Sequence, residues 1–236
     1  MWQRLALREG SYYHLFVLAL ALASACAPGP APLVPEVMPE ISRAEVSRWV
    51  DGYVPNQPQR YDLRWTYETQ KGMARGRAAV VFVPPDSFRF DYRGPFGRSG
   101  AAVVVGDSIV WARPDDEAGG FMAAAPLFWT AIGIPGMPPS DAAVTGRIDS
   151  TVRSWRYDHG LDTLTYQATE GSPATLAAEL RRAGKLLGTV DVELSDTTGQ
   201  PRKATMLFPG SATIVYFTVR SIEPLTSVEQ DIWQRP

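Results

Sequence analysis

The stretch SFRFDYRGPFGRSGAAVVVGDSIVWA, residues 87–112, contains three expected strands joined by very short turns. In residues 87–93 aromatic and charged side chains alternate, which is typical of a strand with one buried face and one wet face. Residues 101–106 and 108–112 are apolar on both faces, as in many parallel sheets, but parallel neighbours need crossovers of roughly a dozen residues or more. The Gly-rich connection at 94–100 is too short for a crossover, so the stretch predicts an antiparallel meander whose two faces are both covered.

The same two patterns continue on both sides of this meander. Residues 61–68 alternate like 87–93, and residues 77–83 are apolar on both faces. The second half predicts further strands between short turns, at 150–158, 162–169, 188–196, 202–209 and 212–222. Residues 174–188 have a helix-like composition, but Gly184 and Gly188 interrupt it and expected hairpin strands surround it, so we expect strand there as well.

Two segments predict helices. Residues 41–53 place Ile41, Trp49 and Tyr53 at roughly helical spacing, as in an amphipathic helix. In PLFWTAIGIPGMPP, residues 126–139, the initial proline suits a first helical turn, and the Gly-Ile-Pro-Gly run ends the helix. This second helix is apolar around nearly its whole circumference, so it must be buried or must cover something apolar. A sheet that curls around this helix, or around a ligand cavity, would cover the doubly apolar strands.

The N-terminus resembles a bacterial lipoprotein signal. Basic residues precede the apolar run LFVLALALASA at 15–25, which is too short for a single membrane span of roughly 20 residues. The run ends in Ala-Ser-Ala-Cys, which resembles a lipobox, and Cys26 is the only cysteine of the chain. An ordinary secretory signal with a chance cysteine is the main alternative, and an uncleaved anchor is a less favoured one. We therefore expect a signal peptide at 1–25, a lipidated Cys26 with a Pro-rich tether at 26–40, and a single domain at 41–236.

The sequence offers little chemistry for catalysis. The net charge is −2 and no basic run is visible, which argues against a nucleic acid partner. The chain has two histidines, and His159 lies in an expected turn where solvation is its simplest role. No cluster of cysteine or histidine suits zinc, no Walker or dinucleotide motif is present, and the acidic run 115–117 reads as a solvated loop. We expect no catalytic residue, no metal and no cofactor, and an envelope hydrolase that uses His159 is the least favoured alternative.

A lipobox, a tether, an amphipathic helix and Trp-containing strands that lead to FRFDYRGPFG together resemble the LolB-like and LolA-like lipoprotein carrier superfamily. The turn Gly94-Pro95-Phe96-Gly97 matches a recurrent Gly-Pro-Leu-Gly turn of LolB-type receptors, with Phe in place of Leu. The resemblance implies a mainly β fold, a strongly curved antiparallel sheet that forms an unclosed half-barrel, with an N-terminal helix and a short helix that plugs its concave side. It also implies an apolar cavity for acyl chains, and an exposed hydrophobic loop whose nearest candidate is 119–129.

The leading functional hypothesis is a monomeric, non-enzymatic protein that is held by a lipid on Cys26 and binds acyl chains or lipoproteins in its cavity. Ala27 follows the cysteine where Asp would favour inner-membrane retention, so we expect an outer-membrane location facing the periplasm. The expected cavity residues are Trp65, Phe88, Phe90, Val103, Val105, Trp111, Phe128, Trp129 and Ile132, for which a plain packed core is the alternative. A second hypothesis is a structural or interaction lipoprotein of an envelope assembly, with a core filled by its own side chains and no ligand.

Overall fold

A computed structural model describes residues 32–34, 37–106, 108–114 and 118–235. The described helices, strands and hydrophobic core all belong to one compact unit, Leu33–Pro236. This part of the chain therefore holds the core contacts that it needs to fold by itself. The expected signal peptide, Cys26 and most of the expected tether lie outside the described residues. Among the described residues, no helix has the length and apolarity needed to cross a membrane.

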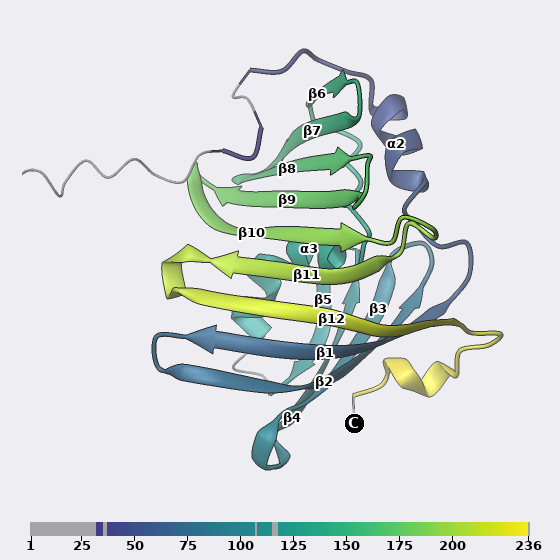
Figure 1. Cartoon of the computed structure of the whole chain (residues 1–236), viewed down its shortest axis with the longest axis vertical. Helices are drawn as coiled ribbons and strands as arrows, with labels where there is room; N and C mark the ends of the chain where they lie inside the picture. Colours follow the sequence, from purple (N-terminus) through teal and green to yellow (C-terminus); the bar gives the residue numbers. More distant parts are fainter. Residues whose placement is uncertain (1–31, 35–36, 107, 115–117, 236) are drawn as a thin grey trace, which may run out of the picture. The chain divides into compact units, whose positions relative to one another are not determined.

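The described strands form one antiparallel sheet of twelve (Figure 1). In spatial order the strands are β5-β4-β3-β2-β1-β12-β11-β10-β9-β8-β7-β6. The first half consists of β1 (Gln59–Thr69), β2 (Gly72–Val83), β3 (Ser87–Arg93), β4 (Ser99–Val105) and β5 (Ser108–Arg113). The second half consists of β6 (Val144–Asp149), β7 (Val152–His159), β8 (Asp162–Thr169), β9 (Thr175–Arg182), β10 (Lys185–Leu194), β11 (Pro201–Phe208) and β12 (Thr213–Pro224). Since β5 and β6 end the order, the sheet is unclosed, and the predicted mainly β fold is confirmed.

The segment with helix-like composition, 174–188, is strand as predicted, and it forms a β-hairpin. Strands β9 and β10 pair antiparallel with a register shift between Leu186 and Gly188, and the turn between them consists of Ala183 and Gly184. Both turn residues have positive φ, 48° and 78°, which suits a tight hairpin turn that matches the twist of its strands. The glycine that breaks the helical pattern is therefore the residue that turns the hairpin.

Helix α2 (Arg43–Asp51) fulfils the first helix prediction and covers part of the second half of the sheet. Its N-cap is Ser42, whose hydroxyl accepts a hydrogen bond from the backbone N–H of Glu45 at 3.2 Å. Val46 and Val50 are fully buried. One turn away, the Trp49 ring meets Trp155 of β7 edge to face, with centroids 5.9 Å apart. The α2 contacts thus fill the core on this half.

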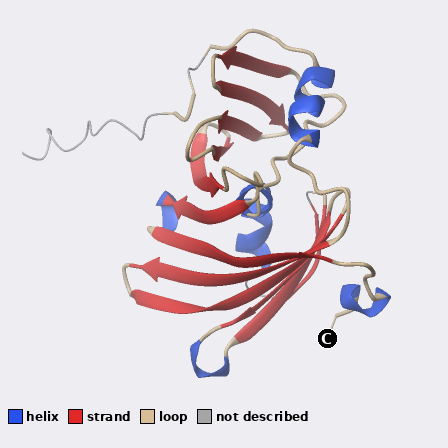
Figure 2. Cartoon of the chain, turned by 45° about the vertical axis from the view of Figure 1, so that its right-hand side comes forward, coloured by secondary structure: helices blue, strands red, loops and turns tan. Residues whose placement is uncertain are grey.

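Helix α3 (Ala118–Ala131) starts earlier than predicted. The sequence suggested a first turn at Pro126, but Pro126 lies inside the helix. Residues 122–125, Met-Ala-Ala-Ala, are strong helix formers, and they extend the helix on the N-terminal side of the proline. Residues 119–129, the loop candidate from the family resemblance, are therefore helical. Helix α3 packs against β5, β9, β10 and β11, so it bridges the two halves of the sheet (Figure 2).

Chain segments near both ends of the described unit also cover the sheet. Val34 and Met38 are buried, and the backbone N–H of Leu33 donates to a Glu179 carboxylate oxygen at 3.3 Å. Packing thus begins before Ile41, where the sequence placed the start of the domain. At the C-terminus, the short helix η5 (Gln230–Trp233) lies against β3 and β5, where the Trp111 indole N–H donates to the carbonyl of Trp233 at 2.8 Å.

Candidate functional site

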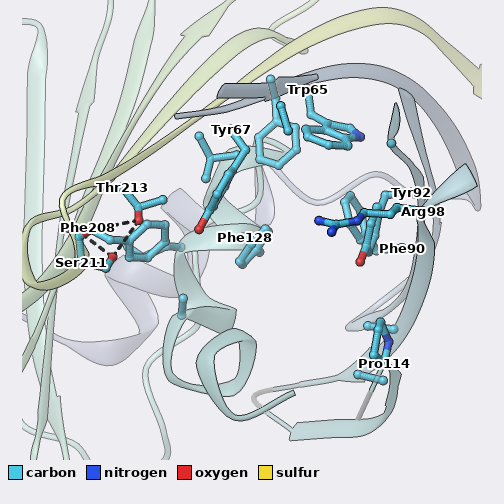
Figure 3. Close-up of a pocket in the computed structure, with 18 of the residues that line it drawn as sticks. Trp65, Tyr67, Phe90, Tyr92, Arg98, Pro114, Phe128, Phe208, Ser211 and Thr213 are labelled. Carbon is cyan, nitrogen blue, oxygen red and sulfur yellow. Dashed lines mark hydrogen bonds between the residues drawn. The ribbon is translucent and has the colours of Figure 1, made fainter. Parts of the chain in front are cut away.

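The first half of the sheet, α3 and parts of β9–β12 enclose an open cavity of about 1040 Å³ (Figure 3). Its wall draws on β1–β5, the short helix η2 (Pro95–Gly97), α3, β9–β12 and the short helix η4 (Pro209–Ser211). The larger apolar lining residues are Trp65, Tyr67, Met73, Phe90, Tyr92, Phe96, Leu127, Phe128, Leu180, Leu187, Phe208, Val215 and Phe217. The polar or charged side chains in the lining, apart from the tyrosines, belong to Arg98, Arg113, Ser211 and Thr213.

Trp65 forms one wall of the cavity because its cross-strand partner is glycine. Trp65 on β1 pairs directly with Gly76 on β2. A Cβ atom at Gly76 would lie 2.6 Å from Cζ2 of the indole and 2.0 Å from the Arg93 carbonyl oxygen. The indole N–H donates to the Arg77 carbonyl at 3.1 Å, which fixes the ring in place. Because Gly76 has no side chain, the indole can pack directly against the backbone of β2.

Tyr92 repeats this arrangement two strands away. Its partner on β4 is Gly100, where a Cβ atom would lie 2.4 Å from Cε1 of the phenol ring. The rings of Trp65 and Tyr92 meet edge to face with centroids 6.1 Å apart. Large aromatic rings that cover cross-strand glycines give a continuous apolar wall without crowding the sheet.

Three phenylalanines from different elements form the inner end of the cavity. Phe90 lies on β3, Phe128 on α3 and Phe217 on β12, and their ring centroids are 6.3–6.4 Å apart in each pair. Behind them is a void of only about 10 Å³, lined by the same three rings with Phe88 and other core residues. The open cavity therefore ends at a packed aromatic layer.

Polar groups in the lining are few and are located on opposite walls. Figure 3 shows the Arg98 guanidinium directed into the cavity beside Tyr92. Across the cavity, the Ser211 hydroxyl donates to the Thr213 hydroxyl at 2.9 Å. Among the described residues that line the cavity, none carries a carboxylate. The described wall is therefore apolar with a positive contribution, which favours an apolar ligand with a neutral or negative polar end.

The nine expected cavity residues fall into three groups. Trp65, Phe90 and Phe128 line the cavity. Phe88, Trp129 and Ile132 belong to the packed core next to it, where the Phe88 and Trp129 rings lie 4.4 Å apart edge to face. The Trp129 indole N–H is bonded to the Gly106 carbonyl at 2.8 Å.

Val103, Val105 and Trp111 lie away from the cavity. Val103 is the partner of both Arg89 and Trp111, and the C-terminal segment covers this outer face of the sheet. Val105 is partly exposed. Residues 101–105 are apolar on both faces, so the sequence contains no signal for which alternate set points inward.

Some cavity residues that were not among the nine expected ones could have been predicted from the sequence. Tyr67 and Tyr92 continue the alternation of Trp65 and Phe90, so the period-two pattern identifies them. Phe208 on β11 and Phe217 on β12 also line the cavity, because β12 pairs with β1 and so brings these strands beside the first half of the sheet. A pairing between the first and last strands has no local sequence signal.

The turn Gly94-Pro95-Phe96-Gly97 lies at the cavity mouth. Phe96 has φ 58° and is fully exposed, although it also borders the cavity. Gly94 leaves room for the Trp65 ring, since a Cβ atom there would lie 3.3 Å from it. The motif thus contributes to the cavity mouth in two ways. Gly94 leaves space for the Trp65 ring, and Phe96 projects into solvent.

The remaining sequence candidates form no chemical site in the described residues. His159 is exposed at the end of β7, and the adjacent Asp158 accepts a hydrogen bond from the Thr163 hydroxyl at 2.6 Å. In the described part of the chain, no group of acidic, cysteine and histidine residues is arranged to hold a metal ion. The acidic run 115–117 lies outside the described residues.

Solved structures share this architecture. A LolA superfamily protein from Nitrosomonas europaea superposes with a TM-score of 0.54 at 10% identity, over 83% of this chain and 98% of that one. A putative outer membrane lipoprotein-sorting protein domain from Vibrio parahaemolyticus gives a TM-score of 0.52 at 8% identity, over 80% of this chain and 95% of that one. The chain therefore has a LolA-like fold, and at these identities the similarity establishes the fold alone. No family model matches the sequence, and a search of curated proteins finds no similar sequence.

Proposed function

We propose that this protein binds an acyl chain, of a lipid or of a lipoprotein, in the open cavity beside α3. The observation that carries the proposal is the open cavity of about 1040 Å³ with its aromatic wall. This volume is at the upper end of the roughly 300–1,000 Å³ typical of small-molecule sites. Transfer of a methylene group from water to such a wall contributes about 0.8 kcal/mol, so a long acyl chain has a large driving force.

The unequal filling of the two halves supports a ligand over a self-filled core. In the second half, Trp155 stacks on Tyr166 with centroids 5.1 Å apart, and both side chains are fully buried. In the first half, the aromatic side chains of Trp65 and Phe90 border open space instead. A structural lipoprotein without a ligand has no need for such a difference between two halves of one sheet.

We further propose that the protein acts without catalysis in the bacterial envelope, attached to the outer membrane through lipid on Cys26 and facing the periplasm. The N-terminal sequence supports this location, and the fold is shared with a lipoprotein-sorting domain. Phe96 supports a LolB-like role in lipoprotein localisation, since its exposed ring gives the cavity mouth an apolar projection. Phe96 replaces the helical stretch 119–129 as the candidate for the exposed hydrophobic loop.

Native mass spectrometry of the unit Leu33–Pro236, purified without detergent, tests the binding proposal. We expect adducts with the mass of one lipid or fatty acid, and saturable uptake of a fluorescent acyl probe by the delipidated protein. A folded protein that shows no adduct and no uptake of the probe contradicts the proposal. In cells, photo-crosslinking from position 128 is expected to trap several lipoproteins, whereas a single stable partner would favour an assembly subunit.

A further inference from the structure

The outer face of the first half carries three arginines in direct cross-strand register. Arg64 on β1 is the partner of Arg77 on β2, and Arg77 is the partner of Arg93 on β3. Trp65 and Tyr92 point into the cavity, so their chain neighbours in this row point to the opposite face. All three arginines are exposed. We call these three residues the arginine row.

The arginine row is unfavourable for the sheet itself. Side chains directly opposite one another have Cβ atoms about 4.5–5.5 Å apart, and like charges at that separation repel. The ion pairs found among the described residues do not include any member of the row. Exposed arginines can turn away from one another, but three in one row still concentrate positive charge on this face.

The nearest carboxylates on the same face are already engaged by other arginines. Along β1, Asp62 accepts a hydrogen bond from Arg60 at 3.1 Å. Along β3, both oxygens of Asp91 accept from Arg89 at 2.8 Å. Along β2, the next residue on this face is the exposed Arg75, and its diagonal neighbour on β1 is Glu68. With Glu68 counted, Arg64, Arg75, Arg77 and Arg93 still outnumber the carboxylates that other arginines leave unengaged on this face. The row is therefore a local basic surface on a chain whose net charge is −2.

Exposed apolar side chains border the basic surface. Arg93 is the last residue of β3, and Phe96 follows it in the η2 turn with its ring in solvent. Met73, two residues before Arg75 on β2, is 56% exposed. Positive charge next to protruding apolar groups suits the interface of an anionic bilayer, where arginines meet the headgroups and apolar side chains enter the acyl boundary. An acidic protein or a nucleic acid would use the charge and leave the apolar groups in water.

We propose that the arginine row docks the protein onto a bilayer surface rich in anionic phospholipid. The row itself lies on the face of the sheet opposite the cavity, while Phe96 and Met73, which border the row, also line the cavity. Net charge alone predicts repulsion from such a surface, so attraction requires a local basic patch. The contact is electrostatic in origin and should weaken as ionic strength rises, since the Debye length is only about 10 Å at 0.1 M salt and exposed charges farther apart than this are largely screened.

The test is co-sedimentation of the unit Leu33–Pro236 with vesicles of phosphatidylethanolamine and phosphatidylglycerol. We expect binding that grows with the phosphatidylglycerol fraction, and that falls at least tenfold in the row variant R64Q/R77Q/R93Q. The matched control removes the same charge elsewhere, in R147Q/R153Q/R202Q, where Arg147 and Arg202 are exposed and Arg153 is half-buried. These three form ion pairs with Asp149, Glu170 and Glu193. Because the row repels itself, the row variant should melt no lower than the parent, which separates lost docking from lost folding.

Selective loss in the row variant, with the control variant within twofold of the parent, supports the proposal. Equal losses in both variants would show a general charge effect and overturn it. The proposal is also overturned if the parent does not bind phosphatidylglycerol vesicles, or if it binds only an acidic polymer such as heparin. Uptake of the acyl probe is measured in parallel, and we expect it to be unchanged in the row variant, so the cavity proposal and the docking proposal fail independently.

Discussion

The indole of Trp65 lies over Gly76, its direct partner on the neighbouring strand, at a distance that leaves no room for a methyl group. A Cβ atom at this position would approach the ring to 2.6 Å and the Arg93 carbonyl to 2.0 Å. Both neighbours are held, the ring by its hydrogen bond to Arg77 and the carbonyl by the sheet. The cavity wall thus depends on a glycine that contributes no side chain.

Gly76→Ala should therefore move the Trp65 ring off the wall and strain the contact between β2 and β3. Overpacking of this kind costs about 1–3 kcal/mol, and we expect lower thermal stability together with weaker uptake of the acyl probe. The measurements are a thermal melt and a titration with the probe. Gly52→Ala is the control, because a Cβ atom there meets the Trp49 carbonyl oxygen at an ordinary 3.5 Å. An unchanged melt in Gly76→Ala would show that the wall can adjust.

Filling the cavity should abolish binding without loss of stability. Ala74 lines the cavity from β2 opposite Tyr67, so Ala74→Trp places an indole in open space. We expect at least tenfold weaker uptake of the acyl probe and a melting temperature equal to or above that of the parent, since new apolar surface is buried. Ala79→Trp, on the outer face of the same strand, is the control and should bind normally. Normal binding by Ala74→Trp would place the ligand elsewhere.

The C-terminal segment should stabilise the edge of the sheet. The Trp111 indole donates to the Trp233 carbonyl at 2.8 Å, and the Arg89 guanidinium lies 5.5 Å from the Trp111 ring and donates to the Ile232 carbonyl. Trp111→Phe removes one hydrogen bond and keeps most of the ring, so we expect a loss of about 1 kcal/mol. Denaturant unfolding gives this value, and limited proteolysis should cleave the C-terminal segment faster. Uptake of the acyl probe is expected to stay the same, because the contact is outside the cavity.

Alkaline unfolding should depend on Tyr61. Burial raises the pKa of this phenol above its ordinary value near 10, because the charged phenolate is poorly solvated in the core. The unfolded state therefore releases its proton first, and stability that is complete below about pH 10 is lost as the pH rises further. Tyr61→Phe removes this group and its 3.0 Å hydrogen bond to Gln59. Between pH 9 and roughly pH 11, the free energy of unfolding from denaturant titrations should fall less in the variant than in the parent. Equal falls in the two proteins would mean that other groups cause the alkaline transition.

The local patterns of the sequence identified most of the fold. Period-two alternation at 61–68 and 87–93 and the short Gly-rich turns determined the meander, and the doubly apolar strands required covers on both faces. The chain segments that cover the two faces of the sheet could not be predicted in detail. Whether Val103 or Ala102 faces the cavity depends on strand register, and the contact of Trp111 with the C-terminal segment joins residues more than a hundred positions apart. Such long-range contacts depend on tertiary packing that short periodic patterns do not encode.

Phe96 combines two features that disfavour it energetically, which points to a role beyond folding. Its backbone has φ 58° and its ring is in solvent. A non-glycine residue in the left-handed region costs of order 1 kcal/mol, so Phe96→Gly should keep or raise the stability in thermal melts. The same change removes the apolar projection at the cavity mouth, and we expect slower transfer of the acyl probe from the protein to vesicles with little change in equilibrium uptake. Phe96→Leu keeps an apolar side chain and should retain most of the transfer rate. If the glycine variant transfers the probe as fast as the parent, the exposed ring has no part in delivery to a membrane.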